Sequence, residues 1–139
     1  YHRFSKVPAP GHVGAGEFEQ QVRYISRHYN PVTVSRIALA LYEGKSLPRN
    51  SIAITVDDGY EDFFSIAWPI LKKYKVPATF YVTTGFVNGD LWLWPDQLRY
   101  LLEQSPEIEN RFHFGLFNVQ TPVKAAEFEQ VFWRLNQIM

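Results

Sequence analysis

Apolar residues recur at helical spacing near the start of the chain. Between residues 17 and 29 they follow one another at steps of 4, 3 and 4, on one face of a helix: Phe18, Val22, Ile25 and Tyr29. Asn30-Pro31 ends this predicted helix, because the residue before a proline avoids the helical backbone conformation. A second helix is predicted over residues 35–43, and Gly44 is a natural residue to end it.

A strand, a helix and another strand are predicted next. Residues 51–56 form a short β-branched run, typical of a strand buried on both faces of a parallel sheet. Residues 60–75 carry apolar side chains on one helical face, at Phe64, Ala67, Leu71 and Tyr74. Pro69 is expected to kink or split that helix. Residues 78–82 are the next apolar run, so the pattern predicts a βαβ unit with parallel strands and a right-handed crossover.

The pattern changes after the second of these strands. Residues 91–96, Leu-Trp-Leu-Trp-Pro-Asp, are aromatic and typical of a loop, and Asp96 is a candidate N-cap for a helix over residues 97–104. Residues 111–117 alternate loosely, which predicts a strand or one arm of a hairpin. Thr121-Pro122 begins a last predicted helix, with threonine as its cap and proline at its first position.

Composition excludes several classes of protein. The chain has 139 residues, 46% hydrophobic and 17% aromatic, which is enough for a core and excludes an intrinsically disordered chain. Its 14 Lys and Arg balance its 14 Asp and Glu, so charge does not indicate a nucleic-acid partner. No apolar run approaches the roughly 20 residues of a membrane span. The lack of cysteine excludes disulfides and thiolate chemistry, and leaves the compartment open.

The candidate chemistry lies in Asp57-Asp58-Gly59, directly after the first strand of the βαβ unit. Active sites of α/β proteins gather at this end of parallel strands, because the loops there converge. Two adjacent ionised carboxylates repel each other, and a bound cation or a division into different protonation roles relieves that cost. One carboxylate as an oxygen ligand and its neighbour as a general base fits this pattern. The alternative is an ordinary turn, in which aspartate and glycine are common.

Residues 52–60, Ile-Ala-Ile-Thr-Val-Asp-Asp-Gly-Tyr, resemble the first motif of the polysaccharide deacetylases, the NodB-homology group called carbohydrate esterase family 4. The usual form of that motif is Thr-Phe-Asp-Asp-Gly. Other segments are similar to the family in the right order, namely residues 1–4 (Tyr-His-Arg-Phe), 18–24, 47–48, 74–82 and 91–96. The resemblance covers roughly residues 1–100 and is weak beyond Leu101.

The resemblance implies a metal-dependent hydrolase that removes N- or O-linked acetyl groups from a polysaccharide. It assigns Asp57 as the general base and Asp58 as a ligand of a divalent ion, typically zinc. It also implies an α/β fold, a partial (β/α) barrel, with residues 1–90 in the catalytic domain and residues 91–139 in a helical insertion. Members act mostly on cell-envelope or exported glycans, while this chain's own residues leave the compartment, the cytoplasm included, and the oligomeric state open.

The sequence departs from the family in its histidines. The family's second motif supplies two histidine ligands, whereas the histidines here, His2, His12, His28 and His113, form no pair at ligand spacing. A catalytic zinc takes three protein ligands, so Asp58 alone does not hold one tightly. We therefore expect the chain to be an N-terminal fragment of a longer deacetylase, inactive by itself. The alternative is a degenerate, non-catalytic module that binds carbohydrate.

Three further residues are candidates for substrate binding. Trp92 and Trp94 offer apolar aromatic faces of the kind that suits sugar rings, although most tryptophans are simply packed. His2 follows Tyr1 at the end of a candidate first strand and is expected at the carboxyl end of the sheet, unless it is a loop residue bonded to backbone. The place of Arg3 relative to this site is not decided by the sequence.

Overall fold

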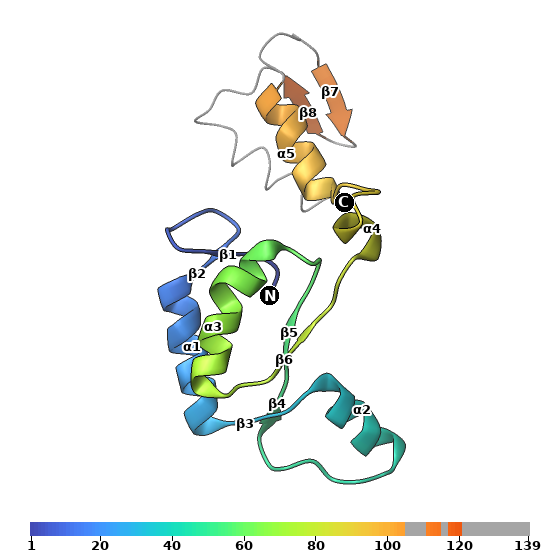
Figure 1. Ribbon diagram of the computed structural model, residues 1–139. Helices are drawn as coiled ribbons and strands as arrows, with labels where there is room; N and C mark the ends of the chain where they lie inside the picture. Colours follow the sequence, from blue (N-terminus) through green and yellow to red (C-terminus); the bar gives the residue numbers. More distant parts are fainter. Residues whose placement is uncertain (105–110, 115–116, 121–139) are drawn as a thin grey trace. The chain divides into compact units, whose positions relative to one another are not determined.

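The computed structural model describes residues 1–104, 111–114 and 117–120, and the side chains of residues 1–100. The chain divides into two compact units, Tyr1–Asn88 (unit 1) and Gly89–Met139 (unit 2). Figure 1 shows the elements of each unit. Helices alternate with short parallel strands in unit 1, so the predicted α/β class is confirmed.

The first two predicted helices are present with shifts of one or two residues. Helix α1 spans Ala15–His28 and α2 spans Val34–Tyr42. Thr33 caps α2, because its side chain accepts a hydrogen bond from the backbone N–H of Arg36 at 3.2 Å. Periodicity was sufficient to find both helices, although α1 buries Phe18 and Val22 on its apolar face, whereas α2 buries Ala40 and leaves Leu41 exposed.

The strands of unit 1 are short and pair in parallel. They are β1 (Phe4–Ser5) with β2 (Val13–Gly14), β3 (Asn30–Pro31) with β4 (Ser51–Ile52), and β5 (Ile54–Val56) with β6 (Ala78–Phe80). The predicted strand over residues 51–56 is thus divided between β4 and β5. The β5–β6 pair confirms the parallel strands of the predicted βαβ unit, with Val56 opposite Phe80.

The crossover helix of that unit has an irregular first part. A π-helical segment, η1 (Phe63–Ala67), leads directly into α3 (Trp68–Tyr74). The backbone N–H of Trp68 bonds to the carbonyl of Phe63, five residues back. Pro69 follows at the start of α3 and has no N–H to continue the preceding ladder, so the wider turn falls where the proline interrupts the helix. The irregularity expected at Pro69 therefore takes the form of a π-helical segment before it.

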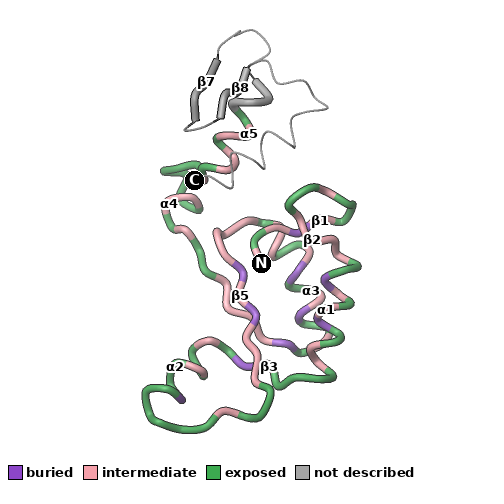
Figure 2. The backbone as a smooth tube through the Cα atoms, turned by 180° about the vertical axis from the view of Figure 1, so that it is seen from behind, coloured by how far each residue is buried: buried purple, intermediate pink, exposed green. Residues whose placement is uncertain are grey.

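The core of unit 1 lies where α1 and α3 pack together against β1 and β5. Figure 1 shows α1 and α3 side by side, and Figure 2 shows buried residues on these helices and on β5. Its fully buried large side chains come from all four elements: Phe4, Phe18, Val22, Val56 and Leu71. The rings of Phe4 and Phe18 meet edge to face, with centroids 4.8 Å apart. Burial of these side chains anchors β5 and thereby the turn that follows it.

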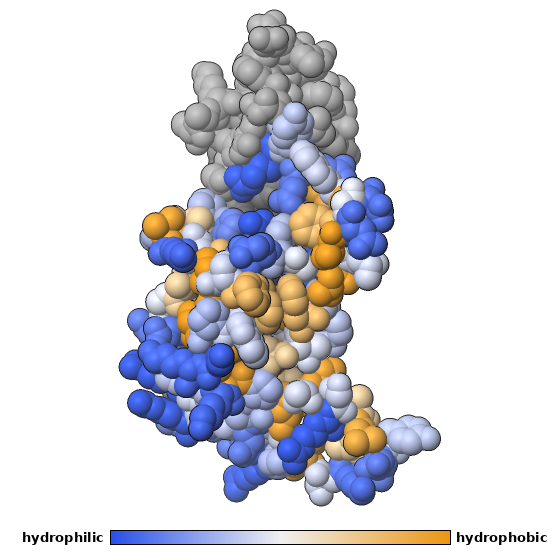
Figure 3. All heavy atoms as spheres, in the orientation of Figure 1, coloured by the Kyte–Doolittle hydropathy of each residue, from blue (hydrophilic) through white to orange (hydrophobic). Residues whose placement is uncertain are grey.

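The surface of unit 1 mixes hydrophilic and apolar areas, as Figure 3 shows for one face. Exposed apolar side chains include Leu41 and Tyr42 on α2, which are 76% and 90% exposed. Among the described residues, no helix combines the length and apolar character needed to cross a membrane.

Unit 2 contains a helix and a hairpin among its described residues. Helix α5 spans Trp94–Gln104, so it begins before the predicted residue 97, and Asp96 lies in its first turn rather than at its N-cap. The backbone N–H groups of Asp96 and Gln97 both bond to the carbonyl of Leu93 at 3.0 Å. Strands β7 (Arg111–Phe114) and β8 (Phe117–Gln120) pair antiparallel, so the strand or hairpin arm predicted over residues 111–117 is confirmed as a hairpin arm, and this arm, β7, ends at Phe114. The helix predicted from Thr121 lies outside the described residues.

Candidate functional site

The candidate site is the turn that follows β5 in unit 1. Asp57 and Asp58 come directly after Val56, the buried last residue of β5. The β6 side fixes this end of the strand, because Tyr81 donates its backbone N–H to the carbonyl of Val56 at 2.8 Å and Thr83 donates to that of Asp58 at 3.1 Å. Both carboxylates therefore project from the carboxyl end of a parallel strand, where α/β proteins place their active sites.

The turn itself has an unusual backbone. Asp58 has a φ of 79° and Gly59 a φ of 101°, and the N–H of Gly59 bonds to the carbonyl of Asp57 at 3.1 Å. A Cβ at Gly59 would lie 3.1 Å from a methyl of Val87 and 3.2 Å from a methyl of Val82, so a side chain there meets crowding and strain together. A positive φ at a non-glycine residue is uncommon, and such residues concentrate at functional sites.

His2 reaches the same turn from the start of the chain. The backbone nitrogen of Tyr1 bonds to the carbonyl of Thr55 and the N–H of Asp57 to the carbonyl of Tyr1, both at 3.0 Å, which aligns this segment parallel to β5. The next residue, His2, then places Nδ1 2.9 Å from Asp58 Oδ2 and Nε2 3.7 Å from Asp57 Oδ2. The structure thus brings together three of the predicted site residues.

The three side chains form an accessible polar cluster. His2 is 63% exposed, Asp57 38% and Asp58 30%. An imidazole between two carboxylates lowers their mutual repulsion when it is protonated, and it exchanges protons with groups at hydrogen-bond distance. The arrangement can therefore accept and donate protons at a surface that a large substrate reaches.

Behind this cluster lies a second polar contact between the same parts of the chain. Arg3 donates from Nε to Oδ2 of Asp62 at 2.7 Å, and the guanidinium carbon lies 3.8 Å from the ring centroid of Tyr60. Sequence analysis did not identify Asp62. Asp58 lies in a turn with a left-handed backbone and not in a helix, so helical spacing does not connect Asp62 to it.

The cluster supplies oxygen and nitrogen donors, which are the ligand types of zinc. Among the residues whose side chains the structure describes, however, no group of three or more His, Cys, Asp or Glu side chains is arranged to hold a metal ion. A catalytic zinc takes three protein ligands and keeps a position for water. The described residues therefore supply one ligand of such a centre, the carboxylate of Asp58, and not a complete set of ligands.

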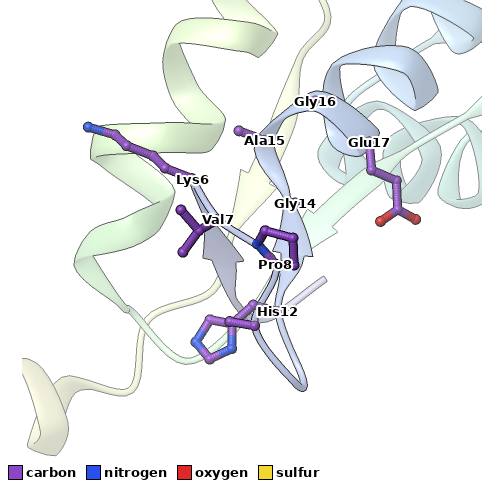
Figure 4. Close-up of a pocket in the computed structure, with 9 residues that line it drawn as sticks. Lys6, Val7, Pro8, His12, Gly14, Ala15, Gly16 and Glu17 are labelled. Atoms are coloured by element: carbon purple, nitrogen blue, oxygen red, sulfur yellow. The ribbon is translucent and has the colours of Figure 1, made fainter.

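Two of the other histidines, His12 and His28, make contacts elsewhere in unit 1. His12 lines a hollow of about 400 Å³ between the loop after β1 and the start of α1, where its Nδ1 bonds to the carbonyl of Pro10 at 2.8 Å (Figure 4). His28 packs against the ring of Tyr24, with centroids 4.3 Å apart. The side chain of His113 lies outside the described residues. Among the described residues, the hydrogen bond of His12 goes to Pro10 and the ring contact of His28 to Tyr24, not to the Asp57–Asp58 turn.

Trp92 and Trp94 belong to unit 2. Trp92 is 54% exposed and Trp94 39%. The indole of Trp92 contacts the ring of Tyr100 edge to face at 5.3 Å, and Gln97 donates a hydrogen bond to the Trp92 carbonyl at 2.6 Å. Trp94 begins α5 and is not in a loop as predicted, because the following Pro95 is tolerated in a first helical turn. A role for either tryptophan in sugar stacking stays a prediction.

Comparisons with known proteins give a consistent result. Among curated proteins, the poly-beta-1,6-N-acetyl-D-glucosamine N-deacetylase of Staphylococcus aureus is 28% identical over 109 residues, or 78% of this chain and 36% of the relative. Among solved structures, the Streptococcus pyogenes deacetylase PplD in complex with acetate is 26% identical, with a TM-score of 0.56 over 74% of this chain and 50% of that one.

A further solved structure agrees with these. IcaB from Ammonifex degensii is 31% identical, with a TM-score of 0.54 over 59% of this chain and 35% of that one. The chain thus spans between about a third and a half of the length of these relatives. A family model described as polysaccharide deacetylase matches residues 44–138. Because that match covers more than half of the residues of this chain, the chain belongs to the polysaccharide deacetylase family.

Proposed function

We propose that the protein is a metal-dependent hydrolase that removes acetyl groups, N- or O-linked, from a polysaccharide. The observation that carries the proposal is the pair Asp57 and Asp58 at the carboxyl end of β5, with His2 at hydrogen-bond distance from Asp58. Family membership supports the reaction class, and the exposure of the three side chains suits a polymeric substrate.

Each residue of the cluster has a distinct role in this proposal. Asp57 accepts the proton of the attacking water, which requires only a carboxylate within hydrogen-bond reach. Asp58 contributes its carboxylate to a divalent ion, zinc by resemblance to the family. When bound, such an ion polarises the acetyl carbonyl and lowers the pKa of a water molecule. His2 presents its exposed ring to the substrate while its Nδ1 stays beside Asp58.

The proposal extends to the fold and to the substrate. The parallel pairs of unit 1 are the first strands of a (β/α) barrel, and residues 91–139 are an insertion into it, with Trp92 and Trp94 stacking on sugar rings. The Staphylococcus aureus relative is named for poly-β-1,6-N-acetyl-D-glucosamine, which makes that polymer the first substrate to test. The proposed class of substrate is a cell-envelope or exported glycan.

The test is release of acetate from acetylated poly-β-1,6-glucosamine by the protein produced from its complete gene, with zinc supplied. Asp57→Asn keeps the shape of the side chain and removes the base, so turnover should fall by about 10²–10⁴-fold while the metal content is unchanged. Asp58→Ala should lose the metal, as measured by elemental analysis. Asp90→Asn removes an exposed carboxylate of unit 2 and is the matched control.

Two results would contradict the proposal. One is a wild-type protein that binds the polymer and releases no acetate, which is the behaviour of a non-catalytic module. The other is an Asp57→Asn variant as active as Asp90→Asn. The 139-residue chain by itself should show little or no turnover, because its described residues supply only part of a metal centre.

A further inference from the structure

Two polar bridges join the same two segments of unit 1. One segment is the start of the chain, with His2 and Arg3 adjacent, and the other runs from the turn after β5 into η1. His2 contacts Asp58 on the outside, and Arg3 contacts Asp62 further in. The partners are 56 and 59 residues apart in sequence, so each bridge fastens segments that the chain does not hold together locally.

The inner bridge is the better buried one. The side chain of Asp62 is 13% exposed and that of Arg3 32%. Oδ1 of Asp62 is buried and has no hydrogen-bond partner among residues 1–100, whose side chains the structure describes, while Oδ2 accepts the hydrogen bond from Arg3. Because the pair is partly buried, removing one member leaves the other charge with less solvent to compensate it than at an exposed pair.

Aromatic packing restricts the inner bridge further. The guanidinium of Arg3 lies over the ring of Tyr60 at 3.8 Å, a cation–π distance. Tyr60 in turn meets Phe86 edge to face, with centroids 5.2 Å apart. Arg3 is thus held between a carboxylate and an aromatic face, and its planar guanidinium can stack flat on the ring while it bonds to the carboxylate, whereas a lysine ammonium is a point charge without a planar face.

The outer bridge has no comparable support. His2 is 63% exposed, and exposed pairs of this kind contribute little by themselves because solvent screens them and side-chain freedom opposes them. The 2.9 Å contact between His2 and Asp58 therefore depends on the residues on either side of His2. Tyr1 aligns the segment with β5 through its backbone bonds to Thr55 and Asp57, and Arg3 fastens the other side of His2 to Asp62.

We propose that Arg3 and Asp62, supported by Tyr60, are positioning residues that hold His2 against Asp58. The catalytic consequence of this arrangement rests on the proposed deacetylase function, whereas the geometric consequence does not. Loss of the inner bridge lets the start of the chain shift relative to the turn, and a misplacement of about 1 Å in a site can cost about 10²-fold in rate.

The first experiment measures geometry without activity. Ring ¹⁵N resonances of His2, assigned with a His2→Gln variant, report the hydrogen bond of Nδ1 in the protein from its complete gene. In Asp62→Asn these resonances should move toward those of a solvent-exposed imidazole. Glu19→Gln, which breaks the exposed contact with Lys73 between α1 and α3, is the matched control and should leave them unchanged.

The second experiment measures catalysis. Asp62→Asn should lower kcat by about 10–100-fold with little change in KM, and Asp62→Glu should recover part of the loss because it restores the carboxylate. If Asp62→Asn does not fold, Arg3→Lys replaces it, since lysine keeps the charge and loses the stacking on Tyr60.

The outcomes separate the two proposals. Unchanged His2 resonances in a folded Asp62→Asn or Arg3→Lys variant overturn the positioning role, whether or not the protein is active. Equal losses of kcat in Asp62→Asn and Glu19→Gln overturn it as well. A wild-type protein that releases no acetate contradicts the deacetylase function and leaves the resonance test of positioning intact.

Discussion

The two sides of unit 1 are built on opposite principles. Between α1 and α3 the contact is apolar, with Phe18, Val22 and Leu71 fully buried, and its ion pair, Glu19 with Lys73, lies outside in solvent. At the end of β5 the polar groups are gathered instead, one ion pair is partly buried, and the backbone of Asp58 is left-handed. The apolar contact between α1 and α3 supplies stability. That stability holds the polar groups and the left-handed backbone at the end of β5, which are unfavourable by themselves.

The largest effect is expected from the apolar side. Leu71→Ala removes a fully buried side chain from the contact between α3 and the core, and the free energy of unfolding should fall by about 2–5 kcal/mol. Leu41→Ala is the same chemical change at a residue that is 76% exposed on α2, and should have almost no effect. Urea denaturation of both variants measures the difference, and similar values for the two would refute the contrast between the sides.

A smaller loss is expected in the turn after β5. Gly59→Ala places a Cβ at a φ of 101° and within 3.2 Å of two valine methyls, so the free energy of unfolding should fall by about 1–3 kcal/mol. Gly16→Ala, in the first turn of α1, meets nothing within 4 Å and should be neutral or slightly stabilising. Thermal unfolding compares the pair. A Gly59→Ala variant as stable as wild type would show that the turn is not strained.

The smallest effect concerns the exposed ion pair. Hydrogen bonds from Lys73 and then from the hydroxyl of Tyr74 lower the pKa of Glu19 below its usual value of 4.5. A lowered pKa in the folded state means that the stabilisation is present above pH 4.5 and is lost as the pH falls through the folded-state value. Glu19→Gln should therefore flatten the acid side of the stability profile slightly. A profile identical to that of wild type would contradict this assignment.

Much of unit 1 was predictable because its elements follow local rules. Helix α1 shows a clear apolar stripe, and β5, a β-branched run, and β6, part of an apolar run, lie on either side of a helix in the sequence. The π-helical segment η1 was not predicted, and the face expected there was wrong at Phe64, which is 70% exposed, whereas Phe63 packs against the core. The early start of α5 was missed because Trp94-Pro95 has two interpretations, a loop or a first helical turn.

Of the candidate site, only the two carboxylates at the end of β5 were placed by local sequence. Asp57 and Asp58 follow β5 directly, so local sequence places both carboxylates. The contact of His2 with Asp58 depends on how the start of the chain aligns with β5 through backbone bonds to Thr55 and Asp57. Likewise, the contact of Arg3 with Asp62 spans 59 residues, and no local pattern encodes a pairing at that separation.

The left-handed backbone of Asp58 restricts what evolution can place there. At a φ of 79°, asparagine and glycine are accommodated with little strain, whereas alanine or a β-branched residue is disfavoured by its Cβ whatever its charge. A lineage that lost the carboxylate while keeping the fold would thus tend to retain asparagine or glycine at this position. In a related sequence, an aspartate at this position indicates that both the carboxylate and the turn are kept. An asparagine or glycine indicates that the turn is kept and the carboxylate is lost.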